Sequence, residues 1–396
     1  MSKARVHGFS GLRVICKTNK YKMADIFSLA LCCVRGIGPA IAKKLMEVYP
    51  SAQALFEESE AALRLLFGKK EKTIEDILKR PMFSRCEKEL EFMYKNNIRS
   101  YFINDCDYPF RLKQIDSPPT CIFVKGNGSL DTRRVVSIVG SRHASDYGRW
   151  VTANIVKELR QYDVTIVSGL ALGIDSAAHV CSLNENIPTF GVLGHGIDRI
   201  YPAQNYALAQ SMLLQGGLVS EFFSNTEASN YNFPRRNRII AALSDVCIVV
   251  EGGIRSGSMI TPKYASEFNR EVFAVPGRIG DTYSEGCNKL ISDNIAISLS
   301  DISQIGKQMN WTQCEQSPQI NANRPQPQPQ TAKPLPQMTQ QEKKVYDLLR
   351  QKGKQHIDDI MLECGLDFAS CSVTLMNLEL KDCIRALPGK CYECAR

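Results

Sequence analysis

The chain has 396 residues, of which 44% are hydrophobic and 23% are charged, a composition typical of globular proteins with about two or three domains. No apolar run reaches the roughly 18 residues that a membrane-spanning helix needs, and no apolar secretory segment follows the basic start, so we expect a cytoplasmic protein without membrane contacts. Of the formal net charge of +8, residues 1–22 carry +6 and no acidic residue, which predicts a disordered basic tail and a nearly neutral remainder. Any other positive surface must therefore come from local clustering.

Residues 23–115 show the periodic apolar positions of helices, and we expect a helix-hairpin-helix domain of the SAM-like kind. Gly36 and Gly38 lie between two helical stretches and are followed by Lys43 and Lys44. Such a turn exposes backbone N–H groups at a helix N-terminus, where a DNA phosphate binds regardless of sequence. The same turn also suits a simple packing connection. These four residues are therefore candidates for a secondary DNA contact.

Residues 116–305 alternate short β-branched runs with longer amphipathic stretches. Each run is apolar throughout and is bounded by glycine, proline or serine, as strands buried on both faces are. This alternation predicts a doubly wound parallel sheet of the α/β class. The expected strands are Val135–Val139, Val164–Val167, Thr189–Leu193, Leu218–Ser220, Val246–Val250 and Val272–Val275. The expected helices are Gly148–Gln161, Ser176–Asn184, Gln204–Gln215, Arg238–Leu243 and Ser258–Asn269.

Residues 306–338 are expected to be a Pro/Gln linker, since the run Pro325–Pro329 is typical of an extended spacer. The segment 339–396 shows three amphipathic stretches and a hairpin pattern, which predict a winged helix, a fold that contacts DNA or protein. The 15 cysteines are scattered through expected helices and strands, which indicates reduced core residues. Cys391 and Cys394 form a C-x-x-C pair, but no second pair completes a zinc site, so we expect no metal and no cofactor.

Candidate ligand-binding residues follow several expected strands, where ligands of doubly wound sheets bind. Glycine turns let backbone N–H groups approach an anion, arginine adds a planar fork of donors, and an aromatic ring offers a face for a base. Phosphate plus base indicates a nucleic acid or a nucleotide. The glycine spacings of dinucleotide and Walker loops are absent, which argues against a nicotinamide or flavin enzyme. The candidates are Gly140, Ser141, Arg142, Ser168, Gly169, Phe233, Arg235, Arg236, Asn237, Arg238, Ser256, Gly257 and Ser258.

Histidine is a common catalytic residue, and His179 and His195 both follow expected strands of the α/β segment. His179 lies four residues after Asp175 on one expected helix face, which predicts a buried hydrogen-bonded pair. His195 lies in a glycine-rich turn after an expected strand, where a structural role is more common. Spacing alone brings together no Ser/His/Asp or Cys/His set, so we expect no catalytic residues.

Seven motifs follow one another in order: Ile138–Arg142, Ser168–Asp175 with Ala178-His179, Tyr201-Pro202, Ser220-Glu221, Phe233–Arg238, Ser256–Thr261 and Val275–Gly277. Together they resemble the DprA/Smf family of DNA-processing proteins. The resemblance spans roughly residues 24–300, and the C-terminal segment resembles the winged helix of many members. It implies an extended Rossmann-like core that forms a homodimer and binds single-stranded DNA without catalysis. It also implies that the protein protects incoming DNA during natural transformation and loads the recombinase RecA.

Carried over by position, the family's functional residues are the phosphate-binding turn Gly140–Arg142, the basic groove Arg235, Arg236 and Arg238, and the candidate base contacts Phe233 and Asn237. The family's glycine loop usually reads Ser-Gly-Leu-Ala-Arg-Gly-Ile-Asp. In this chain Leu172 replaces the arginine, which removes one phosphate contact and puts the affinity and the groove geometry in doubt.

Two other functions stay open. A nucleotide phosphoribohydrolase of the Lonely-guy type has a related Rossmann core and a P-G-G-x-G-T-x-x-E signature. Here the Glu251-Gly252-Gly253 stretch lacks a glutamate at that spacing, and Glu251 and Glu267 are the nearby carboxylates. A scaffold that acts through its winged helix leaves the arginine cluster unexplained. We therefore favour a single-stranded DNA binder and recombination mediator.

Overall fold

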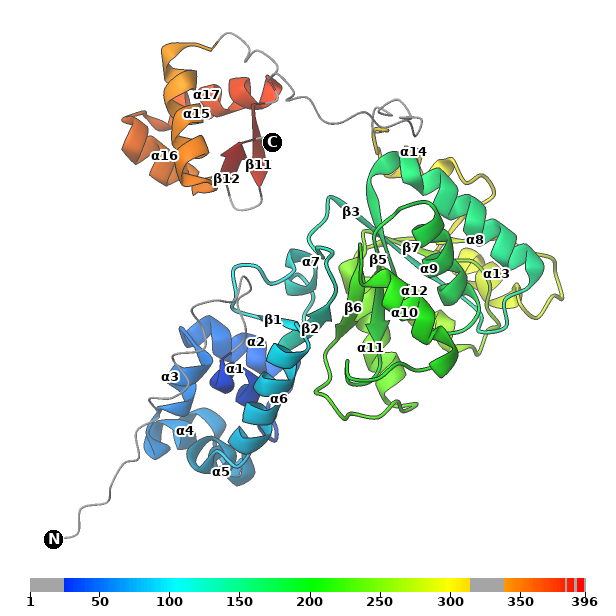
Figure 1. Cartoon of the computed structure of the whole chain (residues 1–396), viewed down its shortest axis with the longest axis horizontal. Helices are drawn as coiled ribbons and strands as arrows, with labels where there is room; N and C mark the ends of the chain where they lie inside the picture. The colour runs from blue at the N-terminus through cyan, green and yellow to red at the C-terminus, as the bar shows by residue number, and fades with distance from the viewer. Residues whose placement is uncertain (1–24, 314–337, 382, 388–389, 395–396) are drawn as a thin grey trace. The chain divides into compact units, whose positions relative to one another are not determined.

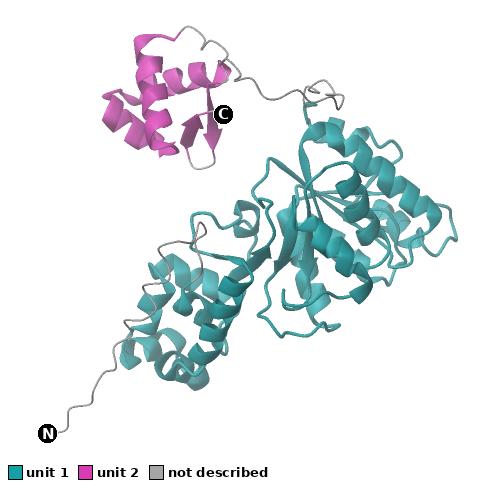
Figure 2. Ribbon diagram, in the orientation of Figure 1, with its two compact units in different colours: residues 1–318 teal, residues 319–396 magenta. Residues whose placement is uncertain are grey.

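The computed structural model describes residues 25–313, 338–381, 383–387 and 390–394. Contacts divide the chain into two compact units, 1–318 and 319–396, which are coloured separately in Figure 2. The predicted basic tail and most of the predicted linker lie outside the described residues. Within the described ranges, each helix is too short or too polar to cross a membrane.

The first unit begins with helices whose starts are fixed by side-chain caps. The side chains of Asp25, Ser51 and Ser59 accept hydrogen bonds from backbone N–H groups of the first turns of α1, α3 and α4. Gly36, between α1 and α2, has a φ of +82°, a conformation that favours glycine. The helices are α1 (Ile26–Leu31), α2 (Pro39–Val48), α3 (Ala52–Phe56), α4 (Glu60–Phe67), α5 (Glu71–Lys79) and α6 (Phe83–Lys95). The predicted N-terminal helical region is therefore present.

A nine-stranded sheet follows, in the order β1-β2-β6-β5-β4-β3-β7-β8-β9 (Figure 1). Neighbours from β6 to β9 in that order are parallel, whereas β1 pairs with β2, and β2 with β6, in antiparallel fashion. The strand order reverses at β3, which lies between β4 and β7, so a ligand crevice is expected at its carboxyl end. The strands are β1 (Arg99–Phe102), β2 (Cys121–Lys125), β3 (Arg134–Val139), β4 (Val164–Ser168), β5 (Thr189–Leu193), β6 (Gly217–Ser220), β7 (Val246–Val249), β8 (Glu271–Ala274) and β9 (Ile297–Ser298).

Helices cover both faces of this sheet. Val136 and Ile138 of β3 pack in a layer with α8, α9 and α14, whereas Val135 and Val139 pack in the layer of α10 to α13. Burial on both faces explains why the strands read as continuous apolar runs. The helices are α7 (Phe110–Lys113), α8 (Asp146–Leu159), α9 (Ile174–Asn184), α10 (Tyr206–Met212), α11 (Asn232–Leu243), α12 (Ile260–Glu267), α13 (Glu285–Ser292) and α14 (Gln304–Gln308). The predicted doubly wound α/β fold is confirmed, with β1 and β2 as an antiparallel extension that the sequence reasoning missed.

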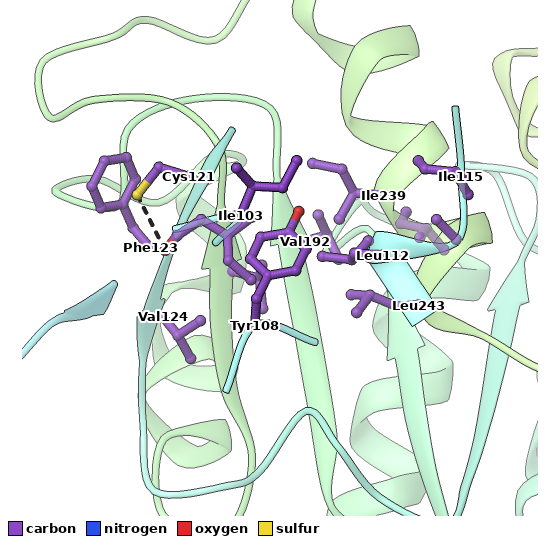
Figure 3. Packing of buried hydrophobic residues seen from close by; sticks show 14 of the residues in the cluster. Ile103, Tyr108, Leu112, Ile115, Cys121, Phe123, Val124, Val192, Ile239 and Leu243 are labelled. Carbon is purple, nitrogen blue, oxygen red and sulfur yellow. Dashed lines mark hydrogen bonds between the residues drawn. The ribbon is translucent and has the colours of Figure 1, made fainter. Parts of the chain in front are cut away.

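The segment that contains β1, α7 and β2 joins the helical region to the sheet. Leu112 packs in one hydrophobic cluster with Ile239 and Leu243 of α11, as Figure 3 shows. Beside them, the buried Arg111 donates hydrogen bonds of 2.7 Å to both carboxylate oxygens of Asp245, which lies directly before β7. The helical region and the sheet therefore share one continuous core within the first unit.

The second unit has three helices and a small antiparallel sheet, in agreement with the predicted winged helix. Thr339 and Glu342 form a capping box at the start of α15. Lys381 donates hydrogen bonds of 2.8 and 2.9 Å to the carboxylate of Glu342, which ties the end of α17 to α15. The elements are α15 (Gln340–Lys352), β10 (Gln355–His356), α16 (Ile357–Cys364), α17 (Phe368–Leu380), β11 (Ile384–Leu387) and β12 (Cys391–Cys394), with the sheet order β10-β12-β11.

Candidate functional site

A cavity of about 430 Å³ lies at the carboxyl ends of the central parallel strands. Three segments that are distant in sequence line it: the turn Gly140–His143 after β3, the first turns of α11, and the turn Ser256–Ser258 after β7. Asp175 at the start of α9 contributes a fourth wall. The cavity therefore occupies the position that the reversal of strand order predicts for a ligand.

The turn after β3 depends on two close approaches of the backbone. A Cβ on Gly140 would lie 2.6 Å from Cγ1 of Ile174, and a Cβ on Gly173 would lie 2.2 Å from the carbonyl oxygen of Ser141. Gly173 also has a φ of +82°. The hydroxyl oxygen of Ser141 accepts a hydrogen bond of 3.1 Å from the backbone N–H of His143. The predicted turn Gly140–Arg142 is therefore packed tightly against the loop between β4 and α9.

An aromatic and cationic stack lies beside this turn. The Phe233 ring stacks on Tyr201 with a centroid separation of 5.9 Å and an interplanar angle of 29°. The guanidinium of Arg142 lies 5.3 Å from the centroid of the Phe233 ring, a cation–π contact. Arg142 is exposed and forms no salt bridge with the residues that the structure describes. Its charge is therefore available to an anion.

Arg236 has a different environment from Arg142. It is 5% exposed and donates hydrogen bonds to the carbonyl oxygens of Gly169 and Val192, at the ends of β4 and β5. Burial lowers the pKa of Arg236 to about 10, against the attraction of Asp175, so the side chain stays charged at neutral pH. Burial raises the pKa of Asp175, while Arg236 and the N–H groups of Ala171 and Gly169 favour its charged form. Arg236 thus lines the cavity and stabilises it by linking the carboxyl ends of β4 and β5.

The other two predicted groove arginines do not line the cavity. Arg238 donates hydrogen bonds to the carboxylate of Glu221 and, at 2.6 Å, to the carbonyl of Ser117, and its side chain is 11% exposed. The guanidinium of Arg235 lies 5.1 Å from the Phe222 ring centroid and 3.8 Å from the Glu221 carboxylate. These residues diverge because α11 already begins at Asn232, and successive helical side chains rotate by about 100°.

Of the remaining predicted residues, some line the cavity and others lie in the protein interior. Asn237, Ser256, Gly257 and Ser258 line the cavity, where the Asn237 amide donates a 3.3 Å hydrogen bond to the Gly257 carbonyl. Ser168 is fully buried, and its hydroxyl donates to the Ile138 carbonyl at 2.6 Å, so it links β4 to β3 and does not face the cavity. Gly169 lines a smaller adjoining hollow of about 60 Å³, together with Leu172, Gly194, His195 and Tyr201.

The two histidines have structural contacts. Asp175 accepts hydrogen bonds from the N–H groups of Gly169 and Ala171, whereas Nδ1 of His179 lies 2.7 Å from the Thr189 hydroxyl. The predicted hydrogen bond between Asp175 and His179 is therefore wrong. His195 is buried with Nδ1 2.9 Å from the Gly196 carbonyl, consistent with its predicted structural role.

Asp175 lines the cavity and Tyr201 lines the adjoining hollow, although neither is among the predicted site residues. Tyr201 follows the turn after β5, and Asp175 opens the helix after β4, so both lie at the carboxyl edge of the sheet. Their position after expected strands was the feature of the sequence that could have identified them as site residues.

The glycine turn near the N-terminus belongs to another part of the first unit. Lys43 donates a hydrogen bond of 3.1 Å to the Ile115 carbonyl, Lys44 is exposed, and Gly38 caps α2. Gly36 precedes it in the turn. None of these four residues lines the cavity.

We predict that Arg236→Met lowers the free energy of unfolding by about 3 kcal/mol, because two strand-end carbonyls and the buried Asp175 lose a cationic partner. The matched change Arg142→Met removes an exposed guanidinium and alters that free energy by less than about 0.5 kcal/mol. Urea denaturation of both variants measures the difference. Equal effects would contradict the distinction between the two arginines.

We predict that acid destabilises the protein partly through His179. Burial lowers its pKa from 6.5 to about 3, so the unfolded chain binds a proton that the folded protein excludes. This contribution to stability is complete above about pH 6.5 and is lost as the pH falls toward 3. His179→Gln, which does not titrate, should flatten the dependence of the unfolding free energy by up to about 1.4 kcal/mol per pH unit. Parallel profiles for the two proteins in urea would contradict it.

Comparison with known proteins identifies the family. Residues 99–310 match the model of DNA recombination-mediator protein A, and residues 326–390 match that of the DprA winged helix domain. The chain is 37% identical to Protein Smf of Synechocystis over 279 residues, covering 69% of this chain and 70% of that protein. It is 42% identical to the DNA processing protein DprA of Bacillus subtilis over 198 residues, which cover 50% of this chain and 67% of that protein.

Two solved structures agree with this comparison. DprA of Streptococcus pneumoniae superimposes with a TM-score of 0.64 at 30% identity, covering 74% of this chain and 99% of that one. DprA of Helicobacter pylori, whose structure concerns its single-stranded DNA binding mode, has a TM-score of 0.50 at 27% identity, covering 54% of this chain and 97% of that one. The chain therefore belongs to the DNA recombination-mediator protein A family and carries that family's winged-helix domain.

Proposed function

We propose that this recombination mediator binds single-stranded DNA in the cavity at the carboxyl ends of β3, β4 and β7. The observation that carries the proposal is the exposed guanidinium of Arg142, 5.3 Å from the Phe233 ring centroid and on the wall of a cavity of about 430 Å³. A free cation next to an aromatic stack suits a phosphate and its adjoining base. The single-stranded DNA binding mode described for the Helicobacter pylori relative supports the same ligand class.

The cavity offers separate groups to the backbone and to the bases. Arg142 is suited to a phosphate, and the hydroxyls of Ser256 and Ser258 and the amide of Asn237 add neutral hydrogen-bonding groups to the lining of the cavity. One face of Phe233 is already covered by Tyr201, which is itself 51% exposed. A base therefore extends this stack from the solvent side of Tyr201. Contacts of both kinds read little sequence, so we propose binding with weak sequence preference.

Membership of the family supports the wider role. We propose that the protein acts in the cytoplasm as a homodimer, protects incoming single-stranded DNA during natural transformation and loads RecA onto it. The proposal includes no catalytic step and no cofactor. We also propose that the N-terminal turn with Gly36, Gly38, Lys43 and Lys44 provides a secondary contact with DNA.

The phosphoribohydrolase alternative receives less support from the geometry. Glu251, its first candidate carboxylate, is 5% exposed and does not line the cavity. It accepts hydrogen bonds from the backbone N–H of Ser145, at 3.0 Å, and from the Ser145 hydroxyl. Its carboxylate is thus used to hold the start of α8. Release of free base from nucleoside monophosphates, abolished by Glu251→Gln in a protein that still folds, would revive this function.

We predict that Arg142→Ala weakens binding of single-stranded oligonucleotides of every sequence and reduces the slope of log affinity against log salt by about one unit, because one fewer phosphate counterion is released. Fluorescence anisotropy with labelled oligonucleotides at several salt concentrations measures both quantities. Double-stranded oligonucleotides provide the comparison for strand preference.

Arg160→Ala is the matched control. Arg160 is exposed, pairs with Glu185 at 3.1 Å and directly follows α8, at the opposite end of that helix from the cavity. It should leave both the affinity and the salt slope unchanged. Arg238→Ala should mainly lower stability, since its guanidinium is paired with Glu221. An unchanged salt slope in Arg142→Ala, or a loss confined to one sequence, would contradict phosphate binding at this arginine.

A further inference from the structure

Two aromatic side chains at the start of α8 are exposed and have no assigned role. Tyr147 is 55% exposed and Trp150 is 62% exposed, although large apolar rings are usually among the more buried side chains. Their rings are stacked on each other, with a centroid separation of 6.2 Å and an interplanar angle of 26°. The two rings therefore lie against each other while both residues keep more than half of their surface exposed.

This aromatic pair is held on a rigid part of the fold. Ser145 caps α8 by accepting a hydrogen bond from the N–H of Gly148, and its own N–H and hydroxyl donate to Glu251. A Cβ on Gly148 would lie 2.3 Å from the Glu251 carboxylate, so the helix start is packed directly against the segment after β7. A preorganised platform loses little conformational entropy when a ligand binds to it.

The pair is continuous with the cavity along the chain. Arg142 and His143 line the cavity, and α8 begins at Asp146, three residues later. Arg149, between the two aromatic residues, donates a hydrogen bond of 3.1 Å to the carbonyl of Ala144 in the connecting segment. Of the charged side chains exposed between residues 142 and 150, Arg142 and Arg149 are cationic and Asp146 is acidic, at the helix start where a carboxylate interacts favourably with the helix dipole.

We propose that Tyr147 and Trp150 form a second base-stacking surface for the single strand where it leaves the cavity, with Arg149 beside its phosphate backbone. This inference rests on the proposed function and extends it to residues outside the cavity. Exposed aromatic rings on a segment that also carries the exposed arginines Arg142 and Arg149 suit a polyanion with aromatic bases, because bases stack on aromatic faces and phosphates pair with arginine. The strand thus passes from the Tyr201–Phe233 stack over the turn after β3 to the start of α8.

The intrinsic fluorescence of Trp150 can report whether a base stacks on its ring. The chain has two tryptophans, and the other, Trp311, packs against Tyr162, which follows the end of α8, at a ring separation of 5.9 Å. In a Trp311→Phe background, tryptophan fluorescence reports Trp150 alone. We expect single-stranded oligonucleotides that are long enough to extend beyond the cavity to quench this fluorescence. Oligonucleotides too short to leave the cavity should bind, by anisotropy, with little quenching.

Substitutions test the contribution to affinity. Trp150→Ala should weaken binding of the longer oligonucleotides roughly 5- to 100-fold, whereas Trp150→Phe, which keeps a ring, should lose much less. Tyr94→Ala is the matched control, because Tyr94 is 48% exposed on α6 and does not adjoin the cavity. Thermal denaturation of all variants checks that these surface changes leave the fold intact.

The outcomes distinguish this inference from the proposed function. Tight, salt-dependent binding without quenching of Trp150, and without loss of affinity in Trp150→Ala, would overturn the second stacking surface and leave the cavity proposal standing. A change from dimer to monomer in Trp150→Ala, seen by light scattering, would overturn it in favour of a contact with a second copy. Absence of any binding to single strands at low salt would overturn both proposals.

Discussion

The buried guanidinium of Arg236 is the interaction on which the geometry of the cavity depends. Placing a cation inside a sheet is unfavourable unless its donors and its charge are both satisfied. Here the carbonyls of Gly169 and Val192 accept its hydrogen bonds, and the carboxylate of Asp175 attracts its charge. A Cβ on Gly169 would lie 2.6 Å from the guanidinium, so the glycine is required for this arrangement. Arg236 therefore joins the carboxyl ends of β4 and β5, and its guanidinium lies 5.9 Å from the centroid of the Phe233 ring.

In this arrangement two arginines have structural roles, whereas a third remains available to bind an anion. Arg236 is bonded to backbone carbonyls and Arg238 to Glu221, whereas Arg142 contacts an aromatic face and keeps its hydrogen-bond donors exposed. The distinction matters because residues 1–22, outside the described residues, account for +6 of the formal net charge of +8. A local arrangement, and not the net charge, therefore supplies the attraction for phosphate that we propose. Leu172, which lines the adjoining hollow, adds no charge there.

The sequence was sufficient to predict the parallel core and the turn Gly140–Arg142, because strands buried on both faces leave unmistakable apolar runs and ligands gather at their carboxyl ends. It was not sufficient to sort the arginines. Their orientation depends on the start of α11 at Asn232, whereas the sequence pattern predicts a helix only from Arg238. Proline is tolerated in the first turn of a helix, so Pro234 is compatible with the earlier start. The antiparallel strand β1 was also missed, since a short strand at a sheet edge has little apolar patterning. The contact of His179 with Thr189 is tertiary and has no signal in the local sequence.

The most direct test of this account is a crystal structure of the protein with a short single-stranded oligonucleotide bound. The account predicts a phosphate within hydrogen-bonding distance of the Arg142 guanidinium, a base on the solvent side of the Tyr201–Phe233 stack, and Arg236 still bonded to its two strand-end carbonyls. An oligonucleotide bound elsewhere on the protein while the cavity stays empty, or Arg236 released from the sheet to contact a phosphate, would contradict it.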